Sequence, residues 1–187
     1  MGSIGKMNNR SDQTLLKRIK QHDQEALEQL FEKYYFPLCD FAFQFVRSFD
    51  FTEEVVSDVF MNIWKNRQKI QISSSLKAYL FTATRNQSLN YLKKEKMDFE
   101  TLDVLENEES HTYQPDEELM FRELESRIKS LINTLPPKRK LIFKLSRLEG
   151  FTYREIADIL DISIRTVQNQ MVQAVKQLAS YSKINNN

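Results

Sequence analysis

Polar side chains suited to reading DNA bases gather toward the C-terminal end of the sequence. An arginine guanidinium can bind guanine through paired hydrogen bonds, and an asparagine or glutamine amide can bind adenine in the same way. From residue 165 onward such groups recur at a spacing that places them on one helical face. The set comprises Arg165, Thr166, Gln168, Asn169 and Gln173, with Ser163 just before it and Arg154 further upstream. Their types and spacing predict a surface that contacts base edges in the major groove.

A helix-turn-helix would position these groups. Thr152 is a suitable N-cap for a first short helix, and residues 161–163 can form a tight connection to a second one. The small side chain of Ala157 would let the two helices approach closely. The second helix would turn an apolar face inward, made of Val167, Met171, Ala174 and Leu178. The alternative is an ordinary helical hairpin with a solvated polar face.

Basic side chains precede this unit, and some of them are expected to contact DNA phosphates. They are Lys138, Arg139, Lys140, Lys144, Arg147 and Arg154. Pro136 and Pro137 suit the start of the helix that carries most of them, because the first helical turn has no use for the missing N–H. Gly150 suits its end as a left-handed cap.

The remainder of the chain is also expected to be helical. Residues 38–114 contain neither Gly nor Pro, the strongest turn-forming residues, and sheets need turns. Apolar residues over 52–64 and 76–94 recur with the period of a helix. Thr52, followed by two glutamates, is expected near the start of the first of these. The fold class is therefore all-α.

Shorter apolar stripes predict further helices. One begins near Leu15, with Ser11 or Asp12 as its N-cap, and another follows Asp23 as a cap. Pro37 is expected to mark a boundary or a kink. A further helix is expected over residues 119–135, ahead of the helix that begins at Pro136 and Pro137.

The charge distribution divides the chain into three parts. Residues 1–96 hold 15 basic and 11 acidic side chains, a net charge of +4. Residues 97–125 hold 1 basic and 11 acidic side chains, a net charge of −10, and residues 126–187 hold 11 and 4, a net charge of +7. Acidic segments with few apolar residues resist burial. We therefore expect two helical domains, over 12–96 and 116–181, joined by an acidic linker over 97–115.

Several function classes are disfavoured by what the sequence lacks. The single Cys39 cannot form an internal disulfide and is expected to act as a small buried hydrophobe. One cysteine and two histidines provide no zinc cluster, and no catalytic triad or glycine-rich phosphate loop is present. We therefore expect no cofactor and no enzymatic activity. No signal peptide or membrane span is recognisable, so we expect a cytoplasmic protein without membrane insertion.

Two sets of motifs resemble a known family, the bacterial sigma factors. The C-terminal set is Leu135-Pro136, Glu149-Gly150, Glu155-Ile156-Ala157, Ile162-Ser163 and Thr166-Val167, in the order of sigma region four. The segment from Glu53 to Trp64 resembles sigma region two, and residues 76–94 resemble the part that melts and reads the promoter minus-ten element. Two domains in this order, without room for a middle domain, are similar to the extracytoplasmic-function group.

The resemblance implies partners and residue roles. Core RNA polymerase and promoter DNA would be the partners, and an anti-sigma factor a further one. The exposed side of the helix over 52–64 would meet the polymerase clamp, whereas without the resemblance it is simply a solvated face. That side carries Glu54, Ser57, Asp58 and Asn62. Val55, Val56, Val59, Phe60, Ile63 and Trp64, on the opposite side, are expected in the core.

The resemblance also places minus-ten recognition in the N-terminal domain. The loop over 65–75 would hold a flipped promoter base, and basic and amide groups after it would follow the single strand. Which of the loop residues Asn66, Arg67, Gln68 or Lys69 would hold the base is left open, and the groups after the loop are Arg85, Asn86, Asn90, Lys93 and Lys94. Tyr79 and Phe81 could stack on bases, but their helical spacing favours the core. The helix-turn-helix would read the minus-thirty-five duplex.

The sequence departs from the family pattern at several positions. Asp161 stands where the turn usually has glycine, and aspartate tolerates the left-handed region moderately well. Gln168, Gln170 and Gln173 stand where basic residues are frequent, and Ser57 where glutamine is frequent. Fewer charges on the recognition helix should weaken nonspecific DNA binding.

The sequence thus predicts a sigma factor that directs promoter-specific initiation. A plain DNA-binding regulator is the alternative, in which residues 12–96 would serve a ligand or a dimer contact. The acidic linker is left with two interpretations, a solvated tether or a nucleic-acid mimic in the polymerase channel.

Overall fold

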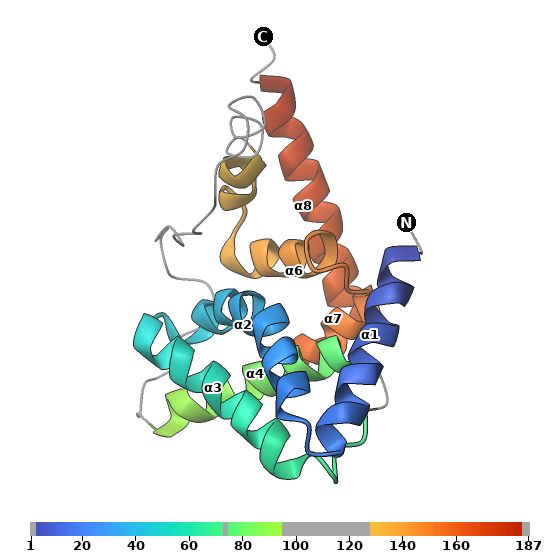
Figure 1. The fold of residues 1–187 in the computed structure, drawn as a ribbon. Coiled ribbons are helices and arrows are strands. Elements are labelled where there is room, and N and C mark those ends of the chain that lie inside the picture. The colour runs from blue at the N-terminus through green and yellow to red at the C-terminus, as the bar shows by residue number, and fades with distance from the viewer. Residues whose placement is uncertain (1–2, 73–74, 95–127, 185–187) are drawn as a thin grey trace, which may run out of the picture. The chain divides into compact units, whose positions relative to one another are not determined.

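A computed structural model describes residues 3–72, 75–94 and 128–184 of the chain (Figure 1). Every regular element within these ranges is an α-helix, as the sequence predicts. The helices separate into two compact units, with α1 to α4 in the first, and α6, α8 and most of α7 in the second. The acidic linker over 97–115 and the start of the helix expected over 119–135 lie outside the described residues.

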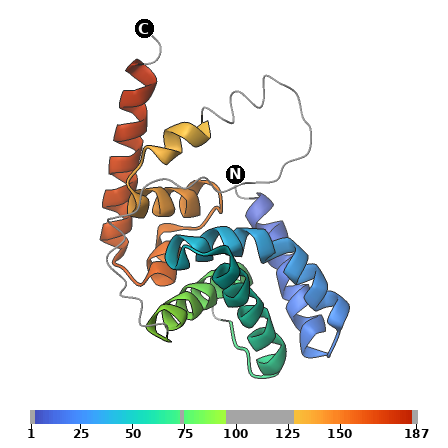
Figure 2. The same ribbon diagram turned by 90° about the vertical axis from the view of Figure 1, so that its left-hand side faces the viewer.

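The first unit is built around α2. Its helices are α1 (Ser3–Lys20), α2 (Gln24–Val46), α3 (Phe49–Asn66) and α4 (Leu76–Lys94). Helix α2 packs against each of the other three, and α1 runs back along it as an antiparallel hairpin (Figure 2). Fully buried Leu30, Leu38 and Leu80 lie in this core, and the Phe41 and Phe81 rings pack with centroids 5.0 Å apart. Phe81 therefore belongs to the core, as its helical spacing favours.

Pro37 does not mark a helix boundary, and α3 begins slightly before Thr52. Helix α2 continues through Pro37 and ends only at Val46, where Arg47 takes a left-handed conformation. Proline removes one helical hydrogen bond, but Tyr34, Leu38 and Phe41 on both sides of it are buried. Tertiary packing of this apolar face outweighs the lost bond. Helix α3 begins at Phe49, before the expected start, and Thr52 is a buried residue of its first turns.

Asp12 does not cap a helix, because α1 begins at Ser3. Its carboxylate is buried and accepts hydrogen bonds from the Lys33 ammonium and the Tyr34 hydroxyl, each at 2.6 Å. The N-cap expectation is therefore wrong, since the polar group is used to fasten α1 onto α2. The expected cap at Asp23 is confirmed, because its side chain accepts a hydrogen bond from the N–H of Ala26.

The second unit is a small helical cluster. Residues 128–133 are helical, and α6 (Pro137–Arg147), α7 (Tyr153–Leu160) and α8 (Ile164–Ile184) follow. Pro137 is the first residue of α6, as expected. Gly150 is left-handed with φ of +73°, but the helix ends at Arg147 with Leu148 as its cap, so Gly150 is not the cap itself. Buried Ile142, Leu145, Ile156 and Val167 form its core.

Thr84 on α4 offers a test of the first core. Its side chain is fully buried, and its hydroxyl has no hydrogen-bond partner among the described residues. A buried hydroxyl without a partner destabilises a protein by about 1 kcal/mol or more. We therefore expect Thr84→Val to raise the free energy of unfolding by about 1 kcal/mol, measured by urea denaturation.

Thr82 supplies the matched control for this substitution. Its hydroxyl donates to the Ala78 carbonyl at 2.9 Å on the same helix. The same change, Thr82→Val, should therefore bring no gain. An equal gain in both variants would show that the helix simply prefers valine, and that the Thr84 hydroxyl carries no penalty.

Candidate nucleic-acid interface

Helix α7 is held at its start by a reciprocal pair of hydrogen bonds. The Thr152 hydroxyl accepts from the N–H of Glu155 at 3.2 Å, and the Glu155 carboxylate accepts from the N–H of Thr152 at 2.9 Å. Such a capping box satisfies two N–H groups that a helix start leaves without partners. The expected cap is confirmed, and α7 begins at a fixed residue although it has only eight.

The connection from α7 to α8 is tight. Asp161 takes a left-handed conformation with φ of 53°, and the N–H of Ile162 donates to the Ala157 carbonyl at 3.0 Å. Ala157, Val167, Met171 and Ala174 are all buried, as the sequence predicts, while Leu178 is half-buried. Helices α7 and α8 form the predicted helix-turn-helix (Figure 1).

Side chains at the start of α8 divide into two groups. The Ser163 hydroxyl accepts from the N–H of Thr166 at 3.0 Å and lies 2.8 Å from the Thr166 hydroxyl. Both residues therefore help to define the helix start. The other candidates at this end project into solvent from one side of the helix: Arg165, Gln168, Asn169 and Gln173. Arg154 on α7 is also exposed.

Arg139 ties α6 to α8. Its guanidinium donates to the Gln170 side chain at 3.2 Å and to the Gln177 side chain at 2.7 Å. Gln177 in turn donates to the Thr134 carbonyl at 3.0 Å. Arg139 therefore orients the recognition helix within its unit, a role that the expected phosphate contacts did not include. Sequence patterns did not reveal these contacts, because the residues lie 31 to 43 positions apart.

The exposed side of α3 carries all four polymerase candidates. Glu54, Ser57, Asp58 and Asn62 are exposed, while Val55, Val56, Val59, Phe60 and Ile63 are buried on the opposite side. Trp64 is only half-buried, in contrast to the expected core position.

The exposed face of α3 also presents Met61, which is 54% exposed. The Asp58 carboxylate accepts a hydrogen bond from Gln87 of α4 at 2.8 Å. Sequence reasoning did not identify Met61 or Gln87.

The minus-ten candidates lie on α4 and in the loop before it. Asn86, Asn90, Lys93 and Lys94 are exposed on α4, whereas Arg85 is half-buried and lies 3.4 Å from the Asn86 side chain. Asn66 is exposed and donates to the Asn62 carbonyl. Arg67 is engaged inside the unit, by the Trp64 carbonyl and by His22. The structure thus brings α3, α4 and this loop into one unit, with Lys93 and Lys94 on its surface.

The lone thiol is not activated. Cys39 is half-buried on α2, and burial raises its pKa to about 11. The thiol is therefore protonated at neutral pH and a weak nucleophile. Its half-buried position is less enclosed than the buried one expected from the sequence. None of the described helices is long and apolar enough to cross a bilayer.

The fold and its exposed faces define a DNA-binding protein with two helical units, one of them a helix-turn-helix. Comparison with protein families specifies it further. Residues 30–97 match the model of sigma-70 region 2, and residues 125–178 match that of sigma-70 region 4. The chain belongs to the sigma-70 family of RNA polymerase sigma factors and to its extracytoplasmic-function group. Its function is that of a sigma factor in transcription initiation.

Curated relatives support this placement along nearly the whole chain. The chain is 27% identical over 173 residues to the ECF RNA polymerase sigma-E factor of Haemophilus influenzae, covering 88% of this chain and 91% of the relative. It is 25% identical over 174 residues to the protein of the same name from Escherichia coli, covering 88% and 90%. The region 2 match favours a sigma factor over a plain DNA-binding regulator, which would need only the second unit.

Solved structures share the fold. The sigma factor RpoE of Bartonella quintana, in a complex with the anti-sigma factor NepR, is 23% identical, with a TM-score of 0.57 over 84% of this chain and 96% of that one. CnrH, in a complex with the cytosolic domain of CnrY, is 18% identical, with a TM-score of 0.57 over 93% and 98%. At these identities the likeness concerns the fold alone.

Proposed function

We propose that the first unit binds core RNA polymerase through the exposed side of α3, and captures the minus-ten strand with α4 and the preceding loop. The observation that carries this proposal is the division of α3 into a buried apolar side and an exposed side with Glu54 and Asp58. The domain boundaries at 12–96, 97–115 and 116–181 and the absence of catalytic activity belong to the same proposal, as does a cytoplasmic location.

The second unit reads the minus-thirty-five duplex. A helix-turn-helix places the start of its second helix in the major groove, and Arg165 and Asn169 are exposed at that end of α8. Their side chains match the hydrogen-bonding edges of guanine and adenine. Exposed Arg147 and Arg154 add positive charge that attracts the phosphate backbone.

An anti-sigma factor is a further partner. The RpoE structure with a similar fold was solved with the anti-sigma factor NepR. Such a partner would cover polymerase-binding surfaces and keep the chain inactive until a signal releases it. Tests of activity should therefore use purified protein that has been freed of bound partners.

A reconstituted transcription assay tests the proposed function. The purified chain is mixed with core RNA polymerase and a promoter library randomised over both elements, and transcripts are sequenced. We expect initiation from a narrow set of sequences, dependent on the chain. Failure to bind core polymerase, or initiation without sequence preference, would contradict the proposal.

Arg165 should determine part of the minus-thirty-five preference. A bidentate arginine contact contributes about 1–3 kcal/mol of discrimination against a wrong base. We expect Arg165→Ala to lower the preference at one base position by about tenfold, measured with the same library. The minus-ten preference should not change.

Arg147→Ala is the control for lost positive charge. Arg147 is exposed at the last turn of α6, where it could meet a phosphate. A phosphate contact should weaken binding uniformly across sequences without altering the preference. Unchanged promoter selection in Arg165→Ala would remove Arg165 from the residues that read DNA.

A further inference from the structure

The loop after α3 is fastened to the turn between α1 and α2. The Lys20 ammonium donates to the Ile70 carbonyl at 2.8 Å, and the Gln68 amide donates to the Lys20 carbonyl. Ile70 itself is buried. These contacts join residues about fifty positions apart in the sequence, so the path of the loop depends on the α1–α2 turn as well as on its own residues.

Arg67 and His22 make the central contact of this attachment. The Arg67 guanidinium lies 2.5 Å from Nδ1 of His22 and donates to the Trp64 carbonyl at 2.5 Å. It also covers the Trp64 ring at 4.4 Å from the centroid, and the His22 ring meets Trp64 edge-on at 6.5 Å. Since arginine can only donate, Nδ1 of His22 must accept. We call these three side chains the His22–Arg67–Trp64 clasp.

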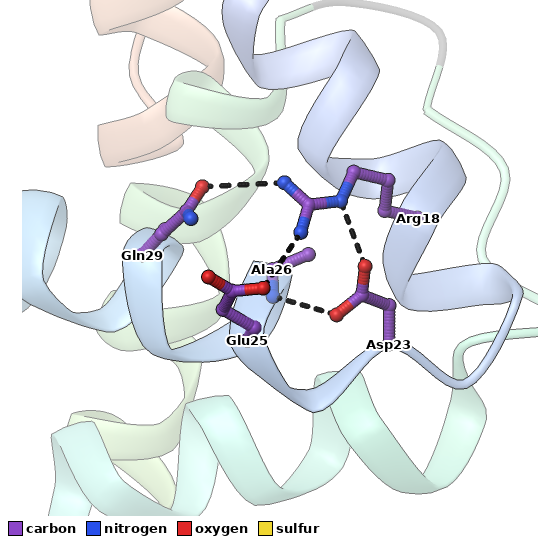
Figure 3. Close-up of polar contacts among 5 residues, drawn as sticks. All are labelled: Arg18, Asp23, Glu25, Ala26 and Gln29. Atoms are coloured by element: carbon purple, nitrogen blue, oxygen red, sulfur yellow. Dashed lines mark hydrogen bonds and ion pairs between the residues drawn. The ribbon is translucent and has the colours of Figure 1, made fainter.

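The turn that carries His22 is itself held in place (Figure 3). Arg18 donates to the Asp23 carboxylate at 2.7 Å, and its other nitrogens lie 3.4 Å from the Glu25 and Gln29 side chains. The Arg18 bond, followed by that from the N–H of Ala26, holds the pKa of Asp23 below its ordinary value. The turn is thus bound to both helices that it joins, and provides a fixed base for the clasp.

We propose that His22 and Arg67 are positioning residues for minus-ten recognition: they fix the loop over 67–72 and do not contact DNA themselves. This inference rests on the proposed function, since it assigns the loop to the minus-ten strand. The observation behind it is that the Arg67 guanidinium is stacked and hydrogen-bonded within the unit. A base-reading role would require it to give up these contacts.

The backbone of His22 allows a clean set of variants. His22 has φ of +66°, a region that only glycine and, to a lesser extent, asparagine adopt readily. His22→Asn keeps a hydrogen-bond acceptor in a side chain that tolerates this backbone. His22→Gly tolerates the backbone but has no acceptor. The comparison therefore separates the clasp from the conformation of the turn.

Trp64 reports on the clasp without polymerase or DNA, because it is the single tryptophan of the chain. We expect His22→Gly and Arg67→Ala to change the emission of Trp64 and to increase its quenching by acrylamide. His22→Asn should keep values close to those of the wild type. Identical emission and quenching in all four proteins would overturn the clasp.

Promoter selection reports on the loop. In holoenzyme with core RNA polymerase and a library randomised over the minus-ten element, we expect His22→Gly to lower discrimination at a minus-ten position by about fivefold. If the loop is ordered in only a fifth of the molecules, the chain binds the preferred minus-ten base about five times more weakly. His22→Asn should restore discrimination, and the minus-thirty-five preference should not change in any variant.

The double variant distinguishes positioning from direct contact. If Arg67 acts through the clasp, His22→Gly and Arg67→Ala remove the same interaction, so combining them should add little. If Arg67 reads DNA, Arg67→Ala alone should lower discrimination and His22→Gly should not. The second result, or altered Trp64 emission with unchanged discrimination, would overturn the proposal. A wild-type chain that fails to initiate would sink the proposed function and the role of the loop with it, while the Trp64 measurement would still show whether the clasp forms.

Discussion

Reversing two charges on α3 should abolish polymerase binding. In Glu54→Arg combined with Asp58→Arg, we expect the affinity for core RNA polymerase to fall at least about a hundredfold. The family resemblance implies that this face meets a basic clamp surface, and like charges at an interface cost several kcal/mol. Both side chains are exposed, so the fold should persist. Binding of a labelled chain to purified core polymerase, measured by fluorescence anisotropy, gives the affinities, and circular dichroism verifies the fold.

Helix α2 offers a matched control for this double variant. Glu28 and Glu32 are also exposed and also four residues apart, but on another helix of the same unit. Glu28→Arg with Glu32→Arg changes the net charge by the same amount. An equal loss of binding in both double variants would attribute the effect to overall charge. Wild-type affinity in the α3 variant would contradict the assignment of this face.

The hydrogen bond from Gln87 to Asp58 adds a detail to this interpretation. It connects the proposed polymerase-binding face of α3 to α4, which carries the minus-ten candidates. The α3 variant removes this bond as well, but a single exposed hydrogen bond contributes only about 1 kcal/mol. Such a loss is too small to account for a hundredfold effect, so the repulsion between charges should dominate.

The helix-turn-helix was predictable because its determinants are local. The Thr152–Glu155 capping box, the left-handed Asp161 and the apolar positions of α8 lie within one short segment. Each of them acts over three to five residues, so the sequence alone exhibits them. The same holds for α3, whose buried and exposed sides follow directly from its helical period.

Contacts between distant segments could not be predicted in this way. His22 and Arg67 are 45 positions apart, and Arg139 and Gln177 are 38 positions apart. No pattern in the sequence pairs them, because their proximity follows from how the helices pack. For the same reason the sequence did not reveal that Arg67 contacts His22 and Trp64.

The boundary predicted at Pro37 and the cap predicted at Asp12 were wrong for a related reason. Proline and aspartate are strong local signals for helix boundaries, but here both lie inside helices. At Pro37 the buried face of α2 maintains the helix. At Asp12 the partners of the carboxylate come from α2, 21 and 22 positions away. Local propensity was overridden in both cases by tertiary contacts.

The buried carboxylate of Asp12 leads to the second large effect. Its side chain is 3% exposed, and its ion-pair partner Lys33 is 30% exposed. Removing the partner of a buried charge costs more than removing the charge itself, because the remaining ion has lost its compensation. We therefore expect Lys33→Met to lower the free energy of unfolding by about 2–3 kcal/mol, below the 3–5 kcal/mol of fully buried pairs because water can partly replace the exposed ammonium.

The decisive result is the ranking of the variants by their loss of unfolding free energy. Asp12→Asn removes the charge, but its amide oxygen can still accept from Tyr34 or Lys33, so it should cost less than Lys33→Met. The double variant should cost less than the sum, because the two side chains form one interaction. Urea denaturation of the three proteins measures these differences.

Lys17→Met controls for the substitution itself. Lys17 is exposed on α1, and surface changes of this kind stay within about 0.5 kcal/mol. If Lys33→Met costs no more than Lys17→Met, water must reach Asp12 and replace the lysine, and the carboxylate is not a buried charge. If the losses of stability follow the expected order, the buried Asp12 carboxylate and its partner Lys33 together fix α1 to α2. Helices α1 and α2 would then be joined at two places, at Asp12 away from the turn that carries His22 and at Arg18 beside it.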